Sequence, residues 1–156
     1  MIHTRELTGH PIPAERTTLT AFRTWRVVDG ELRSPILGVT WRSPVMRADC
    51  YRDLPLPVRA PRVLAEPHLP GHPACSCGIS ATRVPDLDFP RIDFRGVAGI
   101  VELSGQITLE GDTVRGEEAQ VVALALYDRW PREHREAVRA IAARFEADLV
   151  DLGDLL

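Results

Sequence analysis

Residues 100–126, IVELSGQITLEGDTVRGEEAQVVALAL, decide the fold that we expect for this chain. From Ile100 to Ile107 apolar and polar positions alternate, and this period of two predicts a half-buried β-strand. Gly111-Asp112 then offers a two-residue turn, because glycine accepts a positive φ without steric cost. Val114 to Leu126, which ends in a run of apolar residues, is the predicted partner strand. The stretch therefore predicts a long β-hairpin.

The segment after this hairpin has the spacing of an amphipathic helix. Asp128 can cap the helix, and Pro131 suits its first turn, where the missing amide hydrogen costs nothing. Apolar residues then recur at helical spacing, so one stripe should face a core; they are Ala137, Val138, Ile141, Phe145 and Leu149. The opposite face is charged; it carries Arg132, Arg135, Glu136, Arg139, Arg144 and Glu146. We expect a long C-terminal helix and a short final strand at Leu149 to Leu152.

The first third of the chain predicts further strands. Thr20 to Val28 is rich in β-forming residues, and Asp29-Gly30 is a strong signal for a two-residue hairpin turn. Glu31 to Val39 can form the returning strand, although Pro35 restricts it to a sheet edge or divides it. Trp41 to Tyr51 predicts another short strand or turn, which leads into Cys50.

Proline dominates the middle of the chain. Residues 53–95 carry eight prolines, and proline fixes φ and removes a hydrogen-bond donor, so regular structure there must be short. A coil of more than about 40 residues is unusual in a compact domain. We expect a bound metal ion to hold this coil together, because a closed shell of ligands contributes folding free energy. We expect residues 1–18 to be an N-terminal arm. Residues 19–156 should form a single α+β domain of antiparallel β-hairpins, this metal-stapled loop and one long C-terminal helix.

The cysteines of the chain point to a metal site. Cys75 and Cys77 are separated by one residue, His72 precedes them by three, and Cys50 would arrive from a distant strand. Thiolate and imidazole are the ligands that Zn²⁺ prefers, and four of them complete a tetrahedral shell. We therefore predict a zinc site of Cys50, His72, Cys75 and Cys77. His68 is the rival imidazole, but the intervening Pro70-Gly71 makes a helical His68–His72 metal pair unfavourable. Inert buried thiols, an iron–sulfur cluster, a disulfide and a catalytic thiol remain as alternatives.

Composition limits the classes of function. The net charge of −3 disfavours general affinity for nucleic acid. No apolar run approaches the roughly 18 residues that a membrane span requires. The N-terminal residues lack a basic region followed by an apolar one, so we expect no signal peptide and a cytoplasmic location. An odd number of cysteines, three, also argues against a disulfide framework.

Two functions fit the predicted site. The first is a small adaptor that binds another protein and whose Cys3His zinc is structural. The second is a small zinc- or thiol-dependent enzyme that uses the same cluster, which needs an open metal position or a general base; the candidate bases are Glu66, Glu102, Glu117 and Glu118. No recognised catalytic motif supports the enzyme. Gly96-Val97-Ala98-Gly99 lacks the full dinucleotide-binding fingerprint, and we expect it to be a turn.

Several short motifs together resemble a group of small actinobacterial proteins. They are the segment Ala21 to Val27 with Asp29-Gly30, then Leu32 to Pro35, Trp41, Ala48-x-Cys50, His72-Pro73-Ala74, Cys75-x-Cys77-Gly78-Ile79-x-Ala81, Gly99-x-Val101-x-Leu103-x-Gly105, the segment near Arg115 to Ala119, and the C-terminal helix. The resemblance covers most of the chain from about residue 20 onward. The group is uncharacterised, so the resemblance implies no activity. It implies that the cysteines and His72 belong to a pattern shared by the group. The chain departs from that group at two positions, with Ser80 where Tyr is common and Ser104 where Trp is common.

Overall fold

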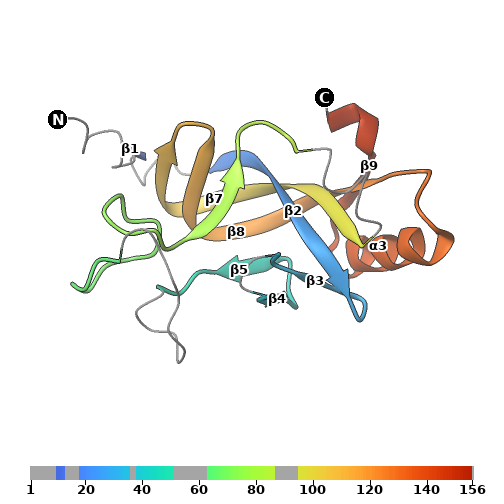
Figure 1. Ribbon diagram of the computed structural model, residues 1–156, viewed down its shortest axis with the longest axis horizontal. Helices are drawn as coiled ribbons and strands as arrows, with labels where there is room; N and C mark the ends of the chain where they lie inside the picture. Colours follow the sequence, from blue (N-terminus) through green and yellow to red (C-terminus); the bar gives the residue numbers. More distant parts are fainter. Residues whose placement is uncertain (1–9, 13–17, 36–37, 51–62, 87–94, 156) are drawn as a thin grey trace. The chain divides into compact units, whose positions relative to one another are not determined.

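A computed structural model of the chain describes residues 10–12, 18–35, 38–50, 63–86 and 95–155. These residues form a mixed α/β structure with many strands and, within the described part, one α-helix (Figure 1). The strands are β1 (His10–Ile12), β2 (Leu19–Val28), β3 (Glu31–Arg33), β4 (Thr40–Trp41), β5 (Val45–Arg47), β6 (Ile79–Thr82), β7 (Gly96–Glu110), β8 (Thr113–Leu126) and β9 (Asp148–Asp151). The helix is α3 (Arg132–Phe145), and a 3₁₀-helix, η3 (Leu152–Leu155), follows β9.

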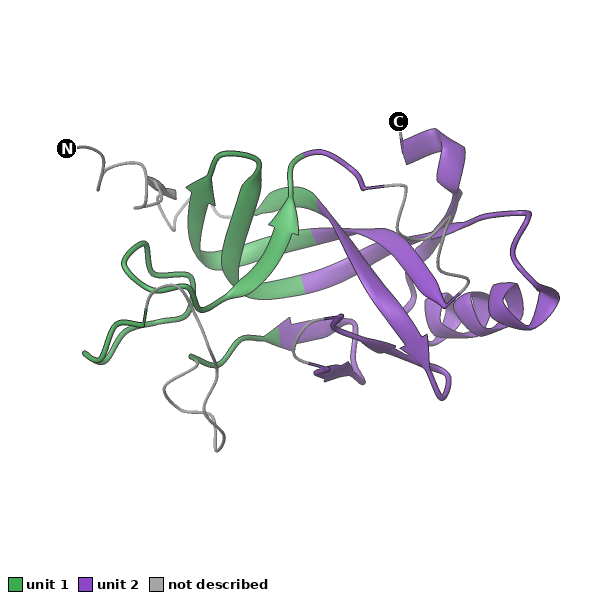
Figure 2. Ribbon diagram, viewed as in Figure 1, with its two compact units in different colours: residues 1–21, 47–83, 102–119 green, residues 22–46, 84–101, 120–156 purple. Residues whose placement is uncertain are grey.

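The chain divides into two compact units that interleave along the sequence (Figure 2). Unit 1 consists of Met1–Ala21, Arg47–Arg83 and Glu102–Ala119. Unit 2 consists of Phe22–Met46, Val84–Val101 and Gln120–Leu156. Because β7 and β8 each pass from one unit into the other, the stretch that predicts the fold contributes to both units.

In unit 1, strands pair on both sides of the second half of β7 and the first half of β8. β1 pairs antiparallel with β7, with His10 opposite Leu109 and Ile12 opposite Ile107. β6 pairs antiparallel with β8, with Ile79 opposite Gly116 and Thr82 opposite Thr113. The predicted alternation of β7 is present, because Val101, Leu103 and Ile107 are buried while the intervening Ile100, Glu102 and Ser104 are half-buried.

In unit 2, β2 pairs antiparallel with β3, and β3 pairs antiparallel with β4. The turn between β2 and β3 is Asp29-Gly30, and both residues have positive φ, 52° and 76°. Such a turn matches the right-handed twist of the two strands that it joins. Trp25 of β2 and Trp41 of β4 are fully buried and meet edge to face, with ring centroids 5.4 Å apart. Aromatic burial of this kind anchors the short strands β3 and β4.

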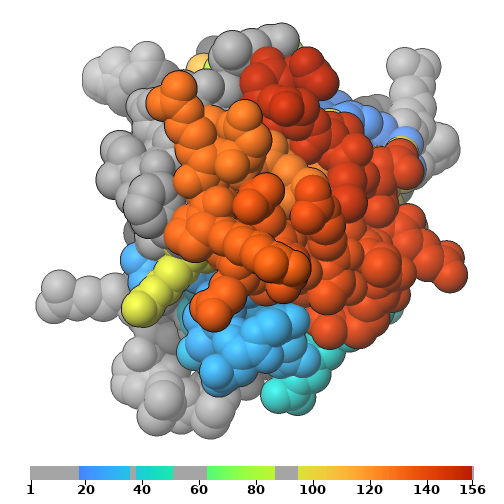
Figure 3. All heavy atoms as spheres, turned by 90° about the vertical axis from the view of Figure 1, so that its right-hand side faces the viewer, coloured from blue at the N-terminus to red at the C-terminus, as the bar shows by residue number. Residues whose placement is uncertain are grey.

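The helix α3 buries one face, as its spacing predicts. Val138, Ile141, Ala142 and Phe145 are buried, while Ala137 is half-buried and Leu149 lies beyond the helix and is exposed. Figure 3 shows α3 (orange to red) beside the β2–β3 turn (blue). Arg144 of α3 donates a hydrogen bond of 3.2 Å to the Gly30 carbonyl in that turn. After the helix, β9 pairs in parallel with β8, and Leu152 and Leu155 of η3 pack on Ala98 and Ala125.

Several predicted boundaries differ from the structure. Asp128 does not cap α3, because Pro131 occupies the N-cap position and no side chain caps the helix. Gly96 to Gly99 is not a turn but the start of β7, where the Cβ of any other residue at position 99 would lie 2.4 Å from the Ala123 carbonyl oxygen. The returning strand ends at Arg33, and the segment from Trp41 begins with the last residue of β4 and contains β5. Most of the arm 1–18, residues 51–62 and residues 87–94 lie outside the described residues.

Candidate metal centre

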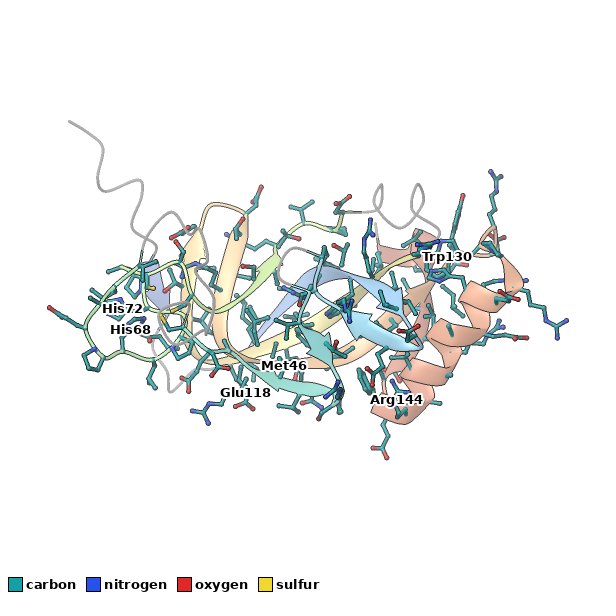
Figure 4. All side chains as sticks on the ribbon, turned by 60° about the horizontal axis from the view of Figure 1, so that its bottom comes forward. Met46, His68, His72, Glu118, Trp130 and Arg144 are labelled. Carbon is teal, nitrogen blue, oxygen red and sulfur yellow. The ribbon has the colours of Figure 1, made fainter. Side chains whose placement is uncertain are left out.

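Four side chains of unit 1 converge on one point. They are Cys50, His68, Cys75 and Cys77, and one potential ligand atom of each lies within 4.8 Å of the ligand atoms of the others. The three cysteines are at most 2% exposed, and Leu64 packs against them. Figure 4 shows His68 and His72 side by side in the loop that carries Cys75 and Cys77. The four residues are thus close enough to hold one metal ion.

Two of the distances within this group match the edges of a coordination tetrahedron. The Sγ atoms of Cys50 and Cys75 are 3.7 Å apart, and His68 Nε2 lies 3.3 Å from Cys77 Sγ. Zinc–sulfur bonds of about 2.3 Å give sulfur–sulfur edges of about 3.8 Å in a regular tetrahedron. A disulfide would instead hold the two sulfurs about 2.05 Å apart, and all three cysteines are free thiols.

The ring of His68 is oriented by the backbone. Its Nδ1 lies 2.6 Å from the carbonyl oxygen of Glu66, which can only accept a hydrogen bond. The proton therefore belongs on Nδ1, and the lone pair of Nε2 faces the sulfur atoms. Histidines that bind metals usually donate their other N–H to such an oxygen, which fixes the tautomer.

The histidine of the group is His68, whereas the sequence favoured His72. The Nδ1 of His72 accepts a hydrogen bond of 2.9 Å from the amide of Ala74, and the His72 carbonyl accepts one of 3.1 Å from the amide of Cys75. The contact to Nδ1 holds the His72 ring over its own turn. The centre of this ring lies 5.5 Å from the centre of the His68 ring. His68 reaches the sulfurs from an irregular loop, so the obstacle that Pro70-Gly71 poses to a helical pair does not apply.

Two glycines let the loop fold back on itself. Gly71 has a φ of 86°, and its amide donates a hydrogen bond of 3.2 Å to the Cys77 carbonyl. A Cβ at position 71 would lie 2.5 Å from the carbonyl oxygen of Gln106, which is closer than real side chains approach. Gly78 has a φ of 116°, and a Cβ there would lie 3.0 Å from the Gly71 nitrogen. The loop therefore requires glycine at both ends of the segment that carries Cys75 and Cys77.

Arg115 supports the cysteine loop from β8. The residue is only 4% exposed, and its Nη1 donates hydrogen bonds to the carbonyls of Cys75, Cys77 and His72. Its Nη2 lies 2.9 Å from a carboxylate oxygen of Glu110. The sequence places Arg115 in a segment of the family resemblance but indicates no role for it, because an arginine within a strand gives no sign of which carbonyls it will meet.

Cys50 is brought to the group by the chain that follows β5. The amide of Ala48 donates a hydrogen bond of 2.9 Å to the Glu117 carbonyl, which ties this segment to β8. The Glu117 carboxylate also forms an ion pair of 2.8 Å with Arg47 and accepts a hydrogen bond of 3.2 Å from the backbone amide of Gln106. The nearly buried Glu117 is therefore occupied by structural contacts.

The thiols differ strongly in acidity. Burial raises the pKa of Cys75, but hydrogen bonds from the Leu64 and Cys77 amides and from the neighbouring thiols outweigh burial and lower that pKa to about 6. Burial raises the pKa of Cys77 to about 12, and the negative charge of Cys75 acts in the same direction. Crowded thiols resist a second ionisation because like charges repel at short range. A divalent cation among the sulfurs removes this conflict, since thiolates bind it directly.

Comparisons of this chain with family models, with curated proteins and with solved structures found no match. The function proposed below therefore rests on the geometry of the four side chains in unit 1. In the part of the chain that the structure describes, no helix is long and apolar enough to cross a membrane.

Proposed function

We propose that this protein binds one Zn²⁺ through Cys50, His68, Cys75 and Cys77, and that the metal is structural. The observation that carries the proposal is the pair of 3.7 Å and 3.3 Å separations among three buried thiols and one oriented imidazole. Sulfur-rich shells with four protein ligands are the usual form of structural zinc. Such a site contributes folding free energy, because the unfolded chain does not preform it.

Four protein ligands leave no coordination position for water, which supports a structural role over a catalytic one. A catalytic zinc keeps one position open for water or substrate. The sulfur atoms are also buried, so a substrate would have no direct access to a nucleophilic thiol. Of the two functions that the sequence favours, we therefore propose the adaptor rather than the enzyme.

As an adaptor, the protein would present the zinc-bound loop to another protein. Val63 and Leu69 are 48% and 54% exposed, and both lie in the segment that leads to the cysteines. Apolar side chains fixed on a rigid loop are suited to contact a partner. The free thiols fit a reducing compartment, and we place the protein in the cytoplasm as part of this proposal. We also propose that the chain belongs to the actinobacterial group that its motifs resemble.

Metal analysis of the purified full chain tests the zinc site. We expect about one zinc per chain, and Cys75→Ser and Cys77→Ser should each lose the metal and lose stability together. Metal-free protein whose residues 63–78 are as protected from proteolysis as before chelation would contradict the proposal. A serine variant that keeps its stability and its zinc would contradict it as well.

The two histidines of the loop provide a matched pair of variants. His68→Ala removes the proposed ligand, so zinc affinity should fall at least about tenfold. His72→Ala removes a neighbouring imidazole that contacts the Ala74 amide, and its zinc affinity should stay close to that of the unmodified protein. Competition with a chromophoric chelator measures both affinities. The reverse order of effects would show that His72 is the ligand.

Leu69→Ser tests the adaptor role without touching the metal ligands. Once a partner protein is identified, Leu69→Ser should weaken its binding while the zinc content stays unchanged. Unchanged partner binding in Leu69→Ser, measured by calorimetry, would remove this loop from the interface.

A further inference from the structure

Arg115 makes an unusual set of contacts for an arginine inside a β-strand. Its side chain is 5% exposed, and its Nη1 donates to the carbonyl oxygens of Cys77 at 2.8 Å, His72 at 3.4 Å, and Cys75. All three carbonyls belong to the short segment that carries two of the proposed zinc ligands. One guanidinium thus binds three carbonyl groups of an irregular loop, and two of these carbonyls, those of His72 and Cys77, also accept a hydrogen bond from an amide of the same loop.

We infer that Arg115 is a positioning residue for the zinc site and that it couples metal occupancy to the order of the β7–β8 turn. This inference rests on the proposed function, since it describes how that site is built and what responds to it. Arg115 itself is not one of the four proposed ligands. It acts through the backbone that aims Cys75 and Cys77.

The electrostatics of the site favour a cation at this position. Three thiolates and one neutral imidazole around Zn²⁺ carry a net charge of about −1, and a buried negative charge is costly unless a cation lies nearby. Arg115 supplies a cation on the carbonyl side of the same loop. The rigid fork of a guanidinium can serve several oxygens at once, whereas the single ammonium of a lysine cannot match that geometry.

The other end of Arg115 reaches the β7–β8 turn. Its Nη2 pairs with Glu110, the last residue of β7, so Arg115 and Glu110 bracket the turn at Gly111 and Asp112. A second contact joins the loop to β7, because Thr108 Oγ1 donates a hydrogen bond of 2.5 Å to the Gly71 carbonyl. A metal ion that orders residues 71–78 therefore also orders residues 108–115. Loss of the ion should loosen both segments together.

Arg115→Met and Arg115→Lys test the positioning role in the full chain. Arg115→Met keeps a long apolar stem but has no donors, and its zinc affinity should fall at least about tenfold. Arg115→Lys keeps the charge and should lose less affinity than Arg115→Met. The control is Arg83→Met, since Arg83 is an exposed arginine of the same unit, and its zinc affinity should not change. Unaltered zinc affinity in a folded Arg115→Met protein overturns the inference.

Hydrogen exchange of the unmodified chain tests the coupling independently of any variant. Removal of zinc should speed exchange at residues 71–78 and at residues 108–115, while the amides of α3 keep their protection. If the exchange rate of residues 108–115 is the same with and without zinc, the coupling is overturned, even if Arg115→Met fails to fold. A chain that binds no zinc at all would refute the proposed function instead, so the two failures are distinguishable.

Discussion

Unit 2 and the cysteine loop of unit 1 are stabilised by different interactions. Unit 2 buries large apolar side chains, among them Trp25, Trp41 and Ile141, each of which is at most 1% exposed. The loop at 63–78 contributes small thiols to the interior and relies on hydrogen bonds to carbonyls. Apolar burial stabilises in proportion to the area removed from water, whereas the loop gains its order from a few directional contacts. The metal should therefore control one region and leave the other largely unaffected.

The largest expected effect is in unit 2. Ile141→Asp should lower the free energy of unfolding by more than about 4 kcal/mol, because it buries a charge without a partner. Ile141 is fully buried on α3. Denaturant melts with and without a chelator should show the same loss. Arg139→Ala, on the exposed side of α3, should change stability by less than about 0.5 kcal/mol. Similar losses for the two variants would mean that the helix has a different buried face.

The next effect concerns the backbone of the cysteine loop. Gly71→Ala should cost about 2–3 kcal/mol, since it adds a clash to an unfavourable positive φ. The added Cβ would meet the Gln106 carbonyl oxygen at 2.5 Å. Gly111→Ala is the matched control, because Gly111 also has a positive φ but has nothing within 4 Å of its Cβ position. Thermal melts should place the cost of Gly111→Ala near 1 kcal/mol, roughly the cost of positive φ alone. Equal costs would show that the close approach at Gly71 is absent in solution.

Acid should weaken zinc binding and leave unit 2 intact. Each proton that the metal displaces makes zinc affinity fall about tenfold, or about 1.4 kcal/mol, per pH unit of acidification. With its pKa raised to about 12, Cys77 is protonated in the metal-free protein at neutral pH, so zinc must displace that proton. The pKa of Cys75 is lowered to about 6, so its proton competes only when the pH falls to about that value, and the slope should steepen there. Chelator competition between pH 5 and pH 8 measures this slope. An affinity that does not depend on pH would exclude thiolate ligands.

The regular elements could be predicted from the sequence because apolar residues recur within each of them at a fixed spacing. The period of two from Ile100 to Ile107 and the helical spacing of Val138, Ile141 and Phe145 both follow from a one-sided interior. The prediction of a turn at Gly96 to Gly99 was wrong because a glycine pair indicates either a turn or a close backbone approach. Here Gly99 lies in β7, where the Ala123 carbonyl approaches too closely for a residue with a Cβ.

Three of the four side chains of the site could be predicted from the sequence. The cysteines could be predicted because all three lie in one proline-rich part of the chain near a histidine, and Cys50, Cys75 and Cys77 do lie together with one imidazole. The choice between His68 and His72 depends on which ring the loop turns inward, and an irregular loop has no period that reveals it. The role of Arg115 was missed for a related reason, since it depends on carbonyls of residues that are about 40 positions away in the chain.

The smallest expected effect belongs to the surface charges of α3. Arg132 and Glu136 form an exposed ion pair of 2.8 Å at i and i+4. A double-mutant cycle of Arg132→Ala and Glu136→Ala should give a coupling of about 0.2–0.5 kcal/mol, because water screens exposed pairs. The net effect of Arg132→Ala should be near zero, since Arg132 is the first residue of the helix and a cation there opposes the helix dipole.

High salt provides the check on that interpretation. In 1 M salt, where charges are screened beyond about 3 Å, the coupling between Arg132 and Glu136 should vanish. The losses from Ile141→Asp and Gly71→Ala should persist in the same buffer, because burial and steric contact do not depend on screening. A coupling above about 1 kcal/mol that survives 1 M salt would show that surface pairs hold α3 in place. Surface electrostatics would then contribute to the stability of α3, in addition to apolar burial in unit 2 and metal binding in the loop.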